Sequence, residues 1–411
     1  SNMAEYSRLT GRPYDVVEPY RMDDADYAVV GMGSLIDTAE ATVDWIREHM
    51  GIKVGTVHVT SFRPFPSTEI VEVLQGVRAF SVLERMDNPM AQSNPLTREI
   101  KAAFADAVTG MAGYPALQSI PTVFSGSVGL GSRDVRPGDI IAVVRNMVEE
   151  GRPYFVTGIK HQMALTVEED PDIRPTGAFS MRGHSVGGFG SVTTNKVIAT
   201  IAGDVFGKKV QAYPKYGSEK KGLPTTYYLT VADDVIRTHS ELNYVDFVPL
   251  NDANALLYTS PLKGLQPGGT LFINTNKATP EEVWASVPPK AKAEIRAKEI
   301  RVMAGDAVKI AKEESPIPDL EVRMQGIVLL GVFLKATPFS ERAGLSDDEV
   351  MAGVEKAVRK YFGKRGEAVV QANLRTIQRG YNESFTLKPE VLDSDYTIPV
   401  LDPRADVQLF V

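Results

Sequence analysis

The sequence contains no cysteine. This absence excludes a disulfide scaffold, a cysteine nucleophile and any iron–sulfur cluster held by thiolates of this chain. The five histidines are scattered, without an i, i+4 pair or an HExxH motif, so the sequence predicts no protein-built zinc site. An excess of basic residues is also missing, because 45 lysines and arginines stand against 52 aspartates and glutamates, a net charge of −7. That balance argues against a nucleic-acid or anionic-membrane surface, since both require a basic face.

Long hydrophobic runs are absent as well. No stretch approaches about 18 uninterrupted apolar residues, and no charged-then-apolar signal segment opens the chain, which predicts a soluble, cytoplasmic protein. Ser1 and Asn2 precede Met3 and are interpreted as an expression scar. With 43% apolar and 24% charged residues, the 411-residue chain has enough apolar side chains for a sizeable core, and its length predicts two or three domains.

Residues 13–155 alternate between strand-like and helix-like patterns. Tyr27–Val30 and Ala79–Leu83 are predicted strands, and Leu96–Val108 is a predicted helix. Strand–helix alternation with short connections predicts an α/β domain, with a mostly parallel sheet covered on both faces. Residues 160–176 are rich in proline and acidic residues, and we interpret them as a linker or surface crossing.

A second α/β unit is predicted to begin with a strand at Ala178–His184, a glycine turn and a helix at Val192–Phe206. Further strands are predicted at Val210–Tyr213, Tyr227–Val231, Val245–Pro249 and Thr270–Asn274. Thr279 and Ser346 each open a capping box, because a glutamate stands three residues after each of them. A last helix is predicted at residues 366–381, and the final thirty residues show little regular pattern.

Two glycine-flanked loops are candidate phosphate-binding elements. Gly187–Ser191 lies between a predicted strand and helix, where glycines allow close backbone approach and the helix N-terminus favours an anion. It is not the dinucleotide GxGxxG pattern, because residue 185 is serine, and a simple tight turn is the alternative. Lys220 and Lys221 follow another strand and suit a polyphosphate, or are a solvated charge pair. Adjacent strands of one sheet bring both loops to the same edge.

Other motifs give weaker evidence for a binding or catalytic site. Gly31–Ser34 also follows a strand, but no cationic residue comes after it. The segment 203–209 differs from a P-loop in spacing and lacks the serine or threonine after the lysine. No GxSxG elbow and no acid–base pair is present, and a lone histidine such as His184 is more often structural than catalytic. The sequence therefore predicts no catalytic residue and no metal ligand.

Several motifs in one order resemble a known family. The first half resembles the transketolase C-terminal-type domain of pyruvate:ferredoxin oxidoreductases, through Leu9–Tyr14, Ala28–Ser34, Phe62–Phe65, Ser81–Arg85 and Gly129–Asp134. The second half resembles the gamma domain of that family, which is Rossmann-like with C-terminal helices, through Gly187–Lys196, Tyr216–Gly222, Pro267–Gly269, Asn274, Gly366–Glu367 and Asn373. The resemblance implies a first domain at 10–157, a linker at 158–177 and the gamma domain with a C-terminal extension at 178–411.

The family joins coenzyme A to a 2-oxoacid after decarboxylation on thiamine diphosphate, and passes electrons through iron–sulfur clusters to ferredoxin. This chain lacks the thiamine-diphosphate GDG…N signature and begins where the pyrimidine-binding domain would end. The resemblance therefore implies a subunit or fragment of a 2-oxoacid:ferredoxin oxidoreductase, with pyruvate as the preferred substrate. Thiamine diphosphate, Mg and 4Fe–4S clusters are expected on partner subunits, ferredoxin or flavodoxin as electron carrier, and the isolated chain is expected to be inactive. No nucleic-acid or membrane partner is expected.

In the family the gamma domain is implicated in receiving coenzyme A. The coenzyme-binding residues that the resemblance implies are Gly188, Gly190, Ser191, Lys220, Lys221 and Asn274. The glycines and the serine would donate to phosphate, the lysines would neutralise it, and Asn274 ends its strand. Two alternatives stay open: a stand-alone coenzyme A or nucleotide-binding module, and a structural scaffold subunit without catalysis. A nicotinamide-dependent dehydrogenase is disfavoured by the broken glycine pattern.

Overall fold

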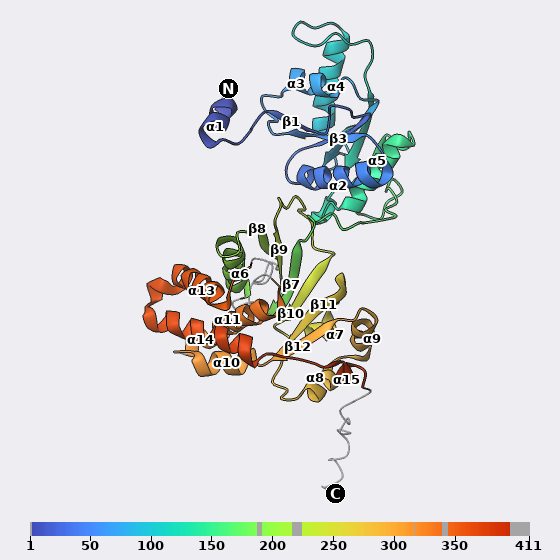
Figure 1. Ribbon diagram of the computed structural model, residues 1–411. Coiled ribbons are helices and arrows are strands. Elements are labelled where there is room, and N and C mark those ends of the chain that lie inside the picture. Colours follow the sequence, from blue (N-terminus) through green and yellow to red (C-terminus); the bar gives the residue numbers. More distant parts are fainter. Residues whose placement is uncertain (1, 187–190, 216–223, 317, 339–343, 395–411) are drawn as a thin grey trace. The chain divides into compact units, whose positions relative to one another are not determined.

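The computed structural model divides the chain into two α/β units (Figure 1). The first comprises Ser1–Arg174 and Arg237–Glu241, and the second comprises Pro175–Ile236 and Leu242–Val411. The predicted fold class is confirmed, since each unit contains one mixed sheet with helices on both faces. The residues that the structure describes are 2–186, 191–215, 224–316, 318–338 and 344–394.

The first unit contains six strands, five α-helices and a short 3-10 helix within the part of it that the structure describes. Its strands are β1 (Val17–Tyr20), β2 (Tyr27–Gly31), β3 (Val54–Val59), β4 (Ala79–Glu84), β5 (Thr122–Ser127) and β6 (Tyr154–Val156). Its helices are α1 (Asn2–Thr10), α2 (Leu35–Met50), α3 (Ser67–Leu74), α4 (Pro95–Val108), α5 (Pro137–Val148) and η1 (Leu130–Ser132).

The strands of the first unit lie in the order β1-β3-β2-β4-β5-β6, and all neighbours are parallel except β1 and β3. Helices α2 and α5 pack on one face of this sheet through Ile46 and Val144. Helices α3 and α4 pack on the other face through Leu74 and Phe104. Because both faces are covered, the central strand β2 is largely apolar and every residue of β4 is buried, as is usual in parallel sheets.

The predicted linker at 158–177 contains the boundary between the units, which falls after Arg174. Most of that segment packs on the first unit. Its acidic run is held on α5, where Arg145 pairs with Glu168 and Glu169. The backbone N–H of Gly138 also donates to Asp170 at 2.9 Å. For most of its length the segment therefore runs over the surface of the first unit.

A short segment from later in the chain completes the first unit. Arg237 donates to the hydroxyl of Tyr20 at 2.9 Å and lies 3.3 Å from a carboxylate oxygen of Asp44. His239 pairs with Asp37 at 3.0 Å. The sequence alone assigns residues 237–241 to the second domain, because nothing local marks this excursion.

The second unit contains seven strands within its described residues. They are β7 (Phe179–Val186), β8 (Lys209–Lys215), β9 (Pro224–Ala232), β10 (Val245–Leu250), β11 (Leu265–Asn274), β12 (Arg301–Gly305) and β13 (Phe385–Thr386). Its helices are α6 (Ser191–Asp204), α7 (Ala255–Tyr258), α8 (Pro280–Ser286), α9 (Pro289–Ala297), α10 (Ala307–Glu314), α11 (Pro318–Ala336), α13 (Asp347–Phe362), η2 (Gly363–Arg365), α14 (Glu367–Glu383) and α15 (Pro389–Leu392).

The order of these strands is β13-β12-β11-β10-β7-β9-β8. The neighbours β12, β11, β10 and β7 are parallel, whereas β9, β8 and β13 pair antiparallel. One face packs against α6, α11, α13 and α14 around Phe333, and the other against α8 and α9 around Trp284. Both predicted capping boxes are confirmed, with the N–H of Glu282 bonded to Thr279 and that of Glu349 to Ser346.

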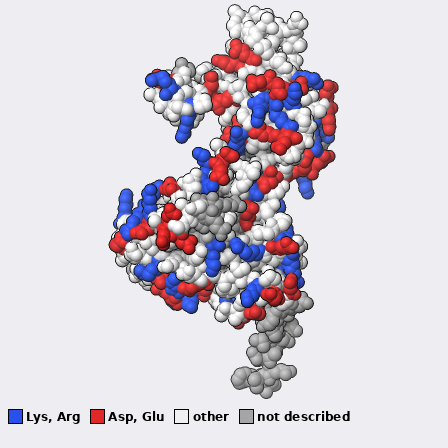
Figure 2. Space-filling view, viewed as in Figure 1, with Lys and Arg blue, Asp and Glu red and all other residues white. Residues whose placement is uncertain are grey.

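Surface charge shows no separation by sign on the visible face. Basic and acidic side chains are interspersed there, apart from an uncharged projection on the first unit (Figure 2). The connection between α4 and β5, residues 109–121, carries no charged residue and exposes Met111 and Ile120. In the part of the chain that the structure describes, no helix combines the length and apolarity needed to cross a bilayer.

Candidate functional site

The second sheet has a topological switch point between β7 and β10. From β7 the chain continues through α6, which packs on one face, to β8 and β9 on one side of the strand. From β10 it continues on the other side of β7 towards β11, and the following α8 packs on the opposite face. At such a point the connections diverge and leave a crevice at the carboxyl ends of the strands, which is where open α/β sheets bind ligands.

Most of the predicted site residues lie outside the described part of the chain. These residues are Gly188, Gly190, Lys220 and Lys221. The strands that flank them are described, and Val186 at the end of β7 pairs with Pro224 at the start of β9. The strands that the two loops follow, β7 and β8, are not adjacent as predicted, because β9 lies between them; both strands end at the same edge of the sheet. Ser191 is the first residue of α6.

Asn274 ends β11 and connects three strand ends. Its side-chain NH₂ donates to the carbonyl oxygen of Asn251 at 3.0 Å, and its side-chain oxygen accepts from the N–H of Ala307 at 2.9 Å. Asn251 follows β10, and Ala307 begins α10 after β12. Asn274 therefore holds the carboxyl edge of the sheet in one shape. A direct contact with a ligand stays a prediction.

Three further residues surround the switch point, and the sequence alone did not bring them together. The hydroxyl of Tyr227 donates to the side-chain oxygen of Asn251 at 3.3 Å, and the backbone N–H of Asn251 donates to the carbonyl of His184 at 2.8 Å. His184 Nε2 and Asn251 Nδ2 are buried and have no hydrogen-bond partner among the residues described. A buried polar atom without a partner costs about 1–3 kcal/mol, so two of them at a switch point favour a ligand-binding role.

Tyr227 owes its position to a glycine on the neighbouring strand. Gly183 is directly opposite Tyr227 in the β7–β9 register, and the tyrosine ring covers the space that a side chain at Gly183 would occupy. Burial raises the pKa of Tyr227, so its hydroxyl stays protonated and can donate to Asn251. The only signal for this arrangement in the sequence is a glycine inside a strand.

His184 is held in its neutral form. Burial, and secondly the nearby charge of Arg182, lowers the pKa of His184 to about 4. Arg182 precedes it by two residues and therefore lies on the same side of β7. A neutral imidazole offers one hydrogen-bond donor and one acceptor, which suits hydrogen bonding to a ligand. It carries no positive charge, so it cannot balance the negative charge of a phosphate.

Acidification is expected to destabilise the second unit through His184. The unfolded chain binds a proton at the ordinary pKa of 6.5, whereas the folded state does so only near 4. The contribution of His184 to stability is therefore complete above about pH 6.5 and is lost as the pH falls towards 4. The total loss is about 3 kcal/mol.

Urea unfolding between about pH 7 and pH 4 measures this loss. The chain has two tryptophans, one in each unit, so in a Trp45→Phe background the fully buried Trp284 reports the second unit alone. His184→Gln should flatten the pH dependence, and His49→Gln, at an exposed position, should leave it unchanged. An equally steep dependence in His184→Gln contradicts the assignment.

Two family matches agree with the two units. Residues 180–383 match the family described as pyruvate ferredoxin/flavodoxin oxidoreductase, and residues 25–140 match pyruvate:ferredoxin oxidoreductase core domain II. The chain belongs to the pyruvate:ferredoxin/flavodoxin oxidoreductase family. The resemblance stated from the motifs is thereby confirmed, in the same domain order.

Individual relatives extend over nearly the whole chain. The pyruvate-flavodoxin oxidoreductase of Trichormus variabilis is 30% identical over 407 residues, which are 98% of this chain and 32% of that protein. The pyruvate:ferredoxin oxidoreductase of Moorella thermoacetica is 27% identical over 92% of this chain and 31% of its own length. The chain thus spans about a third of the length of these curated relatives. Among solved structures, pyruvate oxidoreductase subunit PORC of Thermotoga maritima is similar over 51% of this chain and 99% of its own, with 24% identity and a TM-score of 0.36.

The described residues at the switch point fit the uncharged part of a coenzyme. Tyr227, His184, Asn251 and Asn274 are all neutral hydrogen-bonding groups, so they suit amide and hydroxyl groups better than phosphate. Among the described residues, no group of three or more histidine, aspartate or glutamate side chains is placed to hold a metal ion.

Proposed function

We propose that this chain is a subunit or fragment of a 2-oxoacid:ferredoxin oxidoreductase that acts on pyruvate, and that its second unit binds coenzyme A. The observation that carries the proposal is the switch point of the second sheet, where His184 Nε2 and Asn251 Nδ2 are buried without a hydrogen-bond partner among the described residues. The coenzyme would occupy this edge, with its amide and hydroxyl groups on the neutral side chains. Membership of the family supports the same reaction.

The phosphate end of the coenzyme would be held by the two loops that leave the same sheet edge. Backbone donors of Gly188 and Gly190, with Ser191 at the start of α6, would face phosphate at a helix N-terminus. Lys220 and Lys221 would supply the positive charge that the neutral groups of the crevice lack. Asn274 would keep the strand ends in place through its bonds to Asn251 and Ala307.

Bound coenzyme A supplies the thiol that accepts the acyl group. The residues of this chain would contribute position and exclusion of water, and positioning alone is worth several kcal/mol of a reaction barrier. Decarboxylation and electron transfer would take place on partner subunits that carry thiamine diphosphate, Mg and 4Fe–4S clusters. Ferredoxin or flavodoxin would then take up the electrons.

Replacing both Lys220 and Lys221 with alanine is expected to weaken coenzyme A binding at least about tenfold, because each charge-assisted hydrogen bond to phosphate contributes about 1.5–3 kcal/mol. Isothermal titration of coenzyme A into the 411-residue chain measures the change. The charge-matched control is Lys356→Ala with Lys364→Ala, two exposed lysines of α13 and η2.

Two results would count against the proposal. Equal affinity in the lysine variant and its control would remove the phosphate site from this edge. Absence of any coenzyme A binding by the chain would leave the scaffold alternative. Affinity capture then separates a subunit from a binding module: a subunit co-elutes with partners that reduce viologen in the presence of pyruvate and coenzyme A, and a binding module elutes alone.

A further inference from the structure

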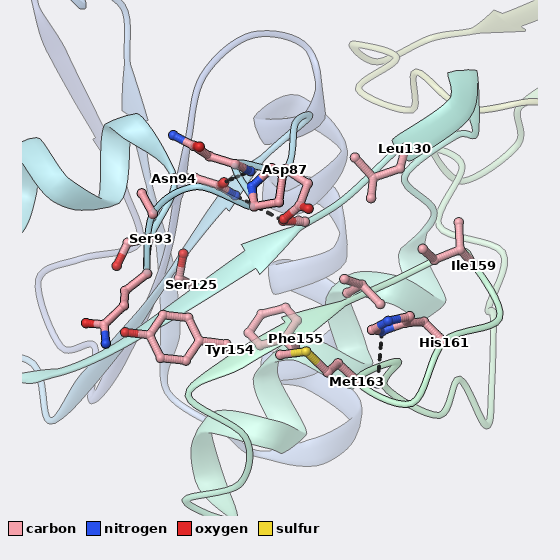
Figure 3. Close-up of a pocket in the computed structure, with 16 residues that line it drawn as sticks. Asp87, Ser93, Asn94, Ser125, Leu130, Tyr154, Phe155, Ile159, His161 and Met163 are labelled. Carbon is pink, nitrogen blue, oxygen red and sulfur yellow. Dashed lines mark hydrogen bonds between the residues drawn. The ribbon is translucent and has the colours of Figure 1, made fainter.

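The first unit contains a cavity that the proposed function does not use. Its volume is about 320 Å³, which is within the range of small-ligand sites. It lies at the carboxyl ends of the parallel strands β4, β5 and β6 (Figure 3). Residues from the segment after β4 form one wall, and β6 with the segment after it forms the other.

The first wall presents a carboxylate held by a chain of hydrogen bonds. Asn94 Nδ2 donates to Ser127 Oγ at 3.0 Å, and Ser127 Oγ donates to Asp87 Oδ1 at 3.2 Å. Asn94 and Ser127 are only 4% and 6% exposed, whereas Asp87 is exposed to the cavity. The side-chain oxygen of Asn94 is fixed in turn by the N–H of Asn88 at 3.0 Å. The Asp87 carboxylate is therefore oriented in advance and still has lone pairs for further donors.

The opposite wall presents a donor beside an apolar surface. The backbone N–H of Met163 donates to His161 Nδ1 at 3.2 Å, so in the neutral imidazole the proton is on Nε2, which can donate. Apolar side chains also line the cavity, among them Leu130, Ile159 and the half-buried Met163, whereas the Phe155 ring is only 2% exposed (Figure 3). The cavity thus combines an acceptor, an apolar surface and a donor.

The charges of the lining argue against a phosphorylated ligand. Asp87 is the permanently charged residue of the lining, and it is negative. Lys101 lies at the rim, where it donates to Ser93 at 3.1 Å and is 5.4 Å from the centroid of the Tyr154 ring. Phosphate sites are typically built on arginine or lysine, and the lining of this cavity contains neither.

We propose that this cavity binds a nucleoside, which is a heterocyclic base on a sugar with a cis-diol. The diol would donate to Asp87, as sugar hydroxyls do to the acidic residue of dinucleotide-binding folds. The base would lie against the apolar side chains of Leu130, Ile159 and Met163, with a ring nitrogen or carbonyl accepting from His161 Nε2. Ser127 is a positioning residue, because it orients the carboxylate.

Isothermal titration of adenosine into the 411-residue chain tests the proposal. Adenosine should bind, and 2′-deoxyadenosine and adenosine monophosphate should bind more weakly. Asp87→Asn should lower the affinity for adenosine at least about tenfold, since it removes a charge-assisted acceptor from the diol. Glu72→Gln, which removes an exposed carboxylate of α3 outside the cavity, is the matched control and should bind like the parent chain.

The Ser127→Ala variant distinguishes a role of Ser127 in orienting the Asp87 carboxylate from a purely structural role. It should weaken adenosine binding while 2′-deoxyadenosine, which lacks one diol donor, is affected less. Three results overturn the proposal: no binding of adenosine at millimolar concentration, equal affinity of the Asp87→Asn and Glu72→Gln variants, or tighter binding of adenosine monophosphate than of adenosine.

Discussion

Replacing Gly183 with valine is expected to destabilise the second unit by about 3 kcal/mol or more. An added Cβ would lie 1.8 Å from Cζ of Tyr227, which is 2% exposed and packs in the core of the second unit. Overpacking of this kind costs about 1–3 kcal/mol and sometimes more. Strand propensity favours valine over glycine, so it predicts the opposite sign. The steric clash decides the outcome, because it displaces the tyrosine that holds Asn251.

Urea unfolding followed by Trp284 emission in the Trp45→Phe background measures the loss for the second unit alone. Gly203→Ala is the matched control, since the nearest atom to its Cβ would be Val210 Cγ2 at 3.8 Å. Gly203 lies in helix α6, so alanine should stabilise the unit by up to about 1 kcal/mol. A Gly183→Val variant as stable as the parent would show that the ring is not packed there.

Replacing Arg182 with alanine is expected to cost about 3–4 kcal/mol. This arginine is 8% exposed, and its guanidinium donates to the carbonyl oxygens of Leu242, at 3.2 Å, and Pro261, at 2.9 Å, as well as to that of Lys263. Alanine leaves these carbonyls without their donor and opens a cavity, and the two penalties add. The same change should raise the pKa of His184, because the charge of Arg182 is one of the causes that lower it.

Both effects of Arg182→Ala are measurable. Unfolding by urea gives the stability, and the proton resonances of the imidazole give the pKa of His184. Arg323→Ala, at an exposed position on α11, is the control and should change stability by less than about 0.5 kcal/mol. Arg182→Lys keeps a charge but reaches fewer carbonyls, so it should fall between the two. An unchanged pKa of His184 in Arg182→Ala would mean that burial alone keeps the histidine neutral.

Elements with a local signal were predictable. The capping boxes at Thr279 and Ser346 act within one helical turn, and the structure places the starts of α8 and α13 there. Helix α11 was missed for the opposite reason. Its residues 326–333 are apolar on every side because the helix is buried on every side, so they show no helical period. Strand β12 was missed as well, since its short apolar run has no period that distinguishes it from a helix.

The candidate site also contains residues that the sequence could predict and residues that it could not. Glycines and paired lysines in loops after strands are local patterns, and the strands before those loops, β7 and β8, end at the same edge of the sheet. The neutral cluster of His184, Tyr227 and Asn251 was not predictable as a group. His184 and Tyr227 lie in β7 and β9, and Asn251 follows β10, and these three strands are adjacent only after the sheet has formed. Asn274 was predicted at its strand end, but its bracing bonds to Asn251 and Ala307 were not.

The sequence by itself determined the α/β class, the position of most strands and helices, and the family. These depend on periodicity, caps and motifs, which act over a few neighbouring residues. Only the tertiary structure decided which strands pair, and therefore that Tyr227 covers Gly183, that Arg237 joins the first unit, and that Asp87 faces His161 across a cavity. Strand register is set by the burial of whole apolar faces, a sum over residues distant in the chain that no local pattern contains.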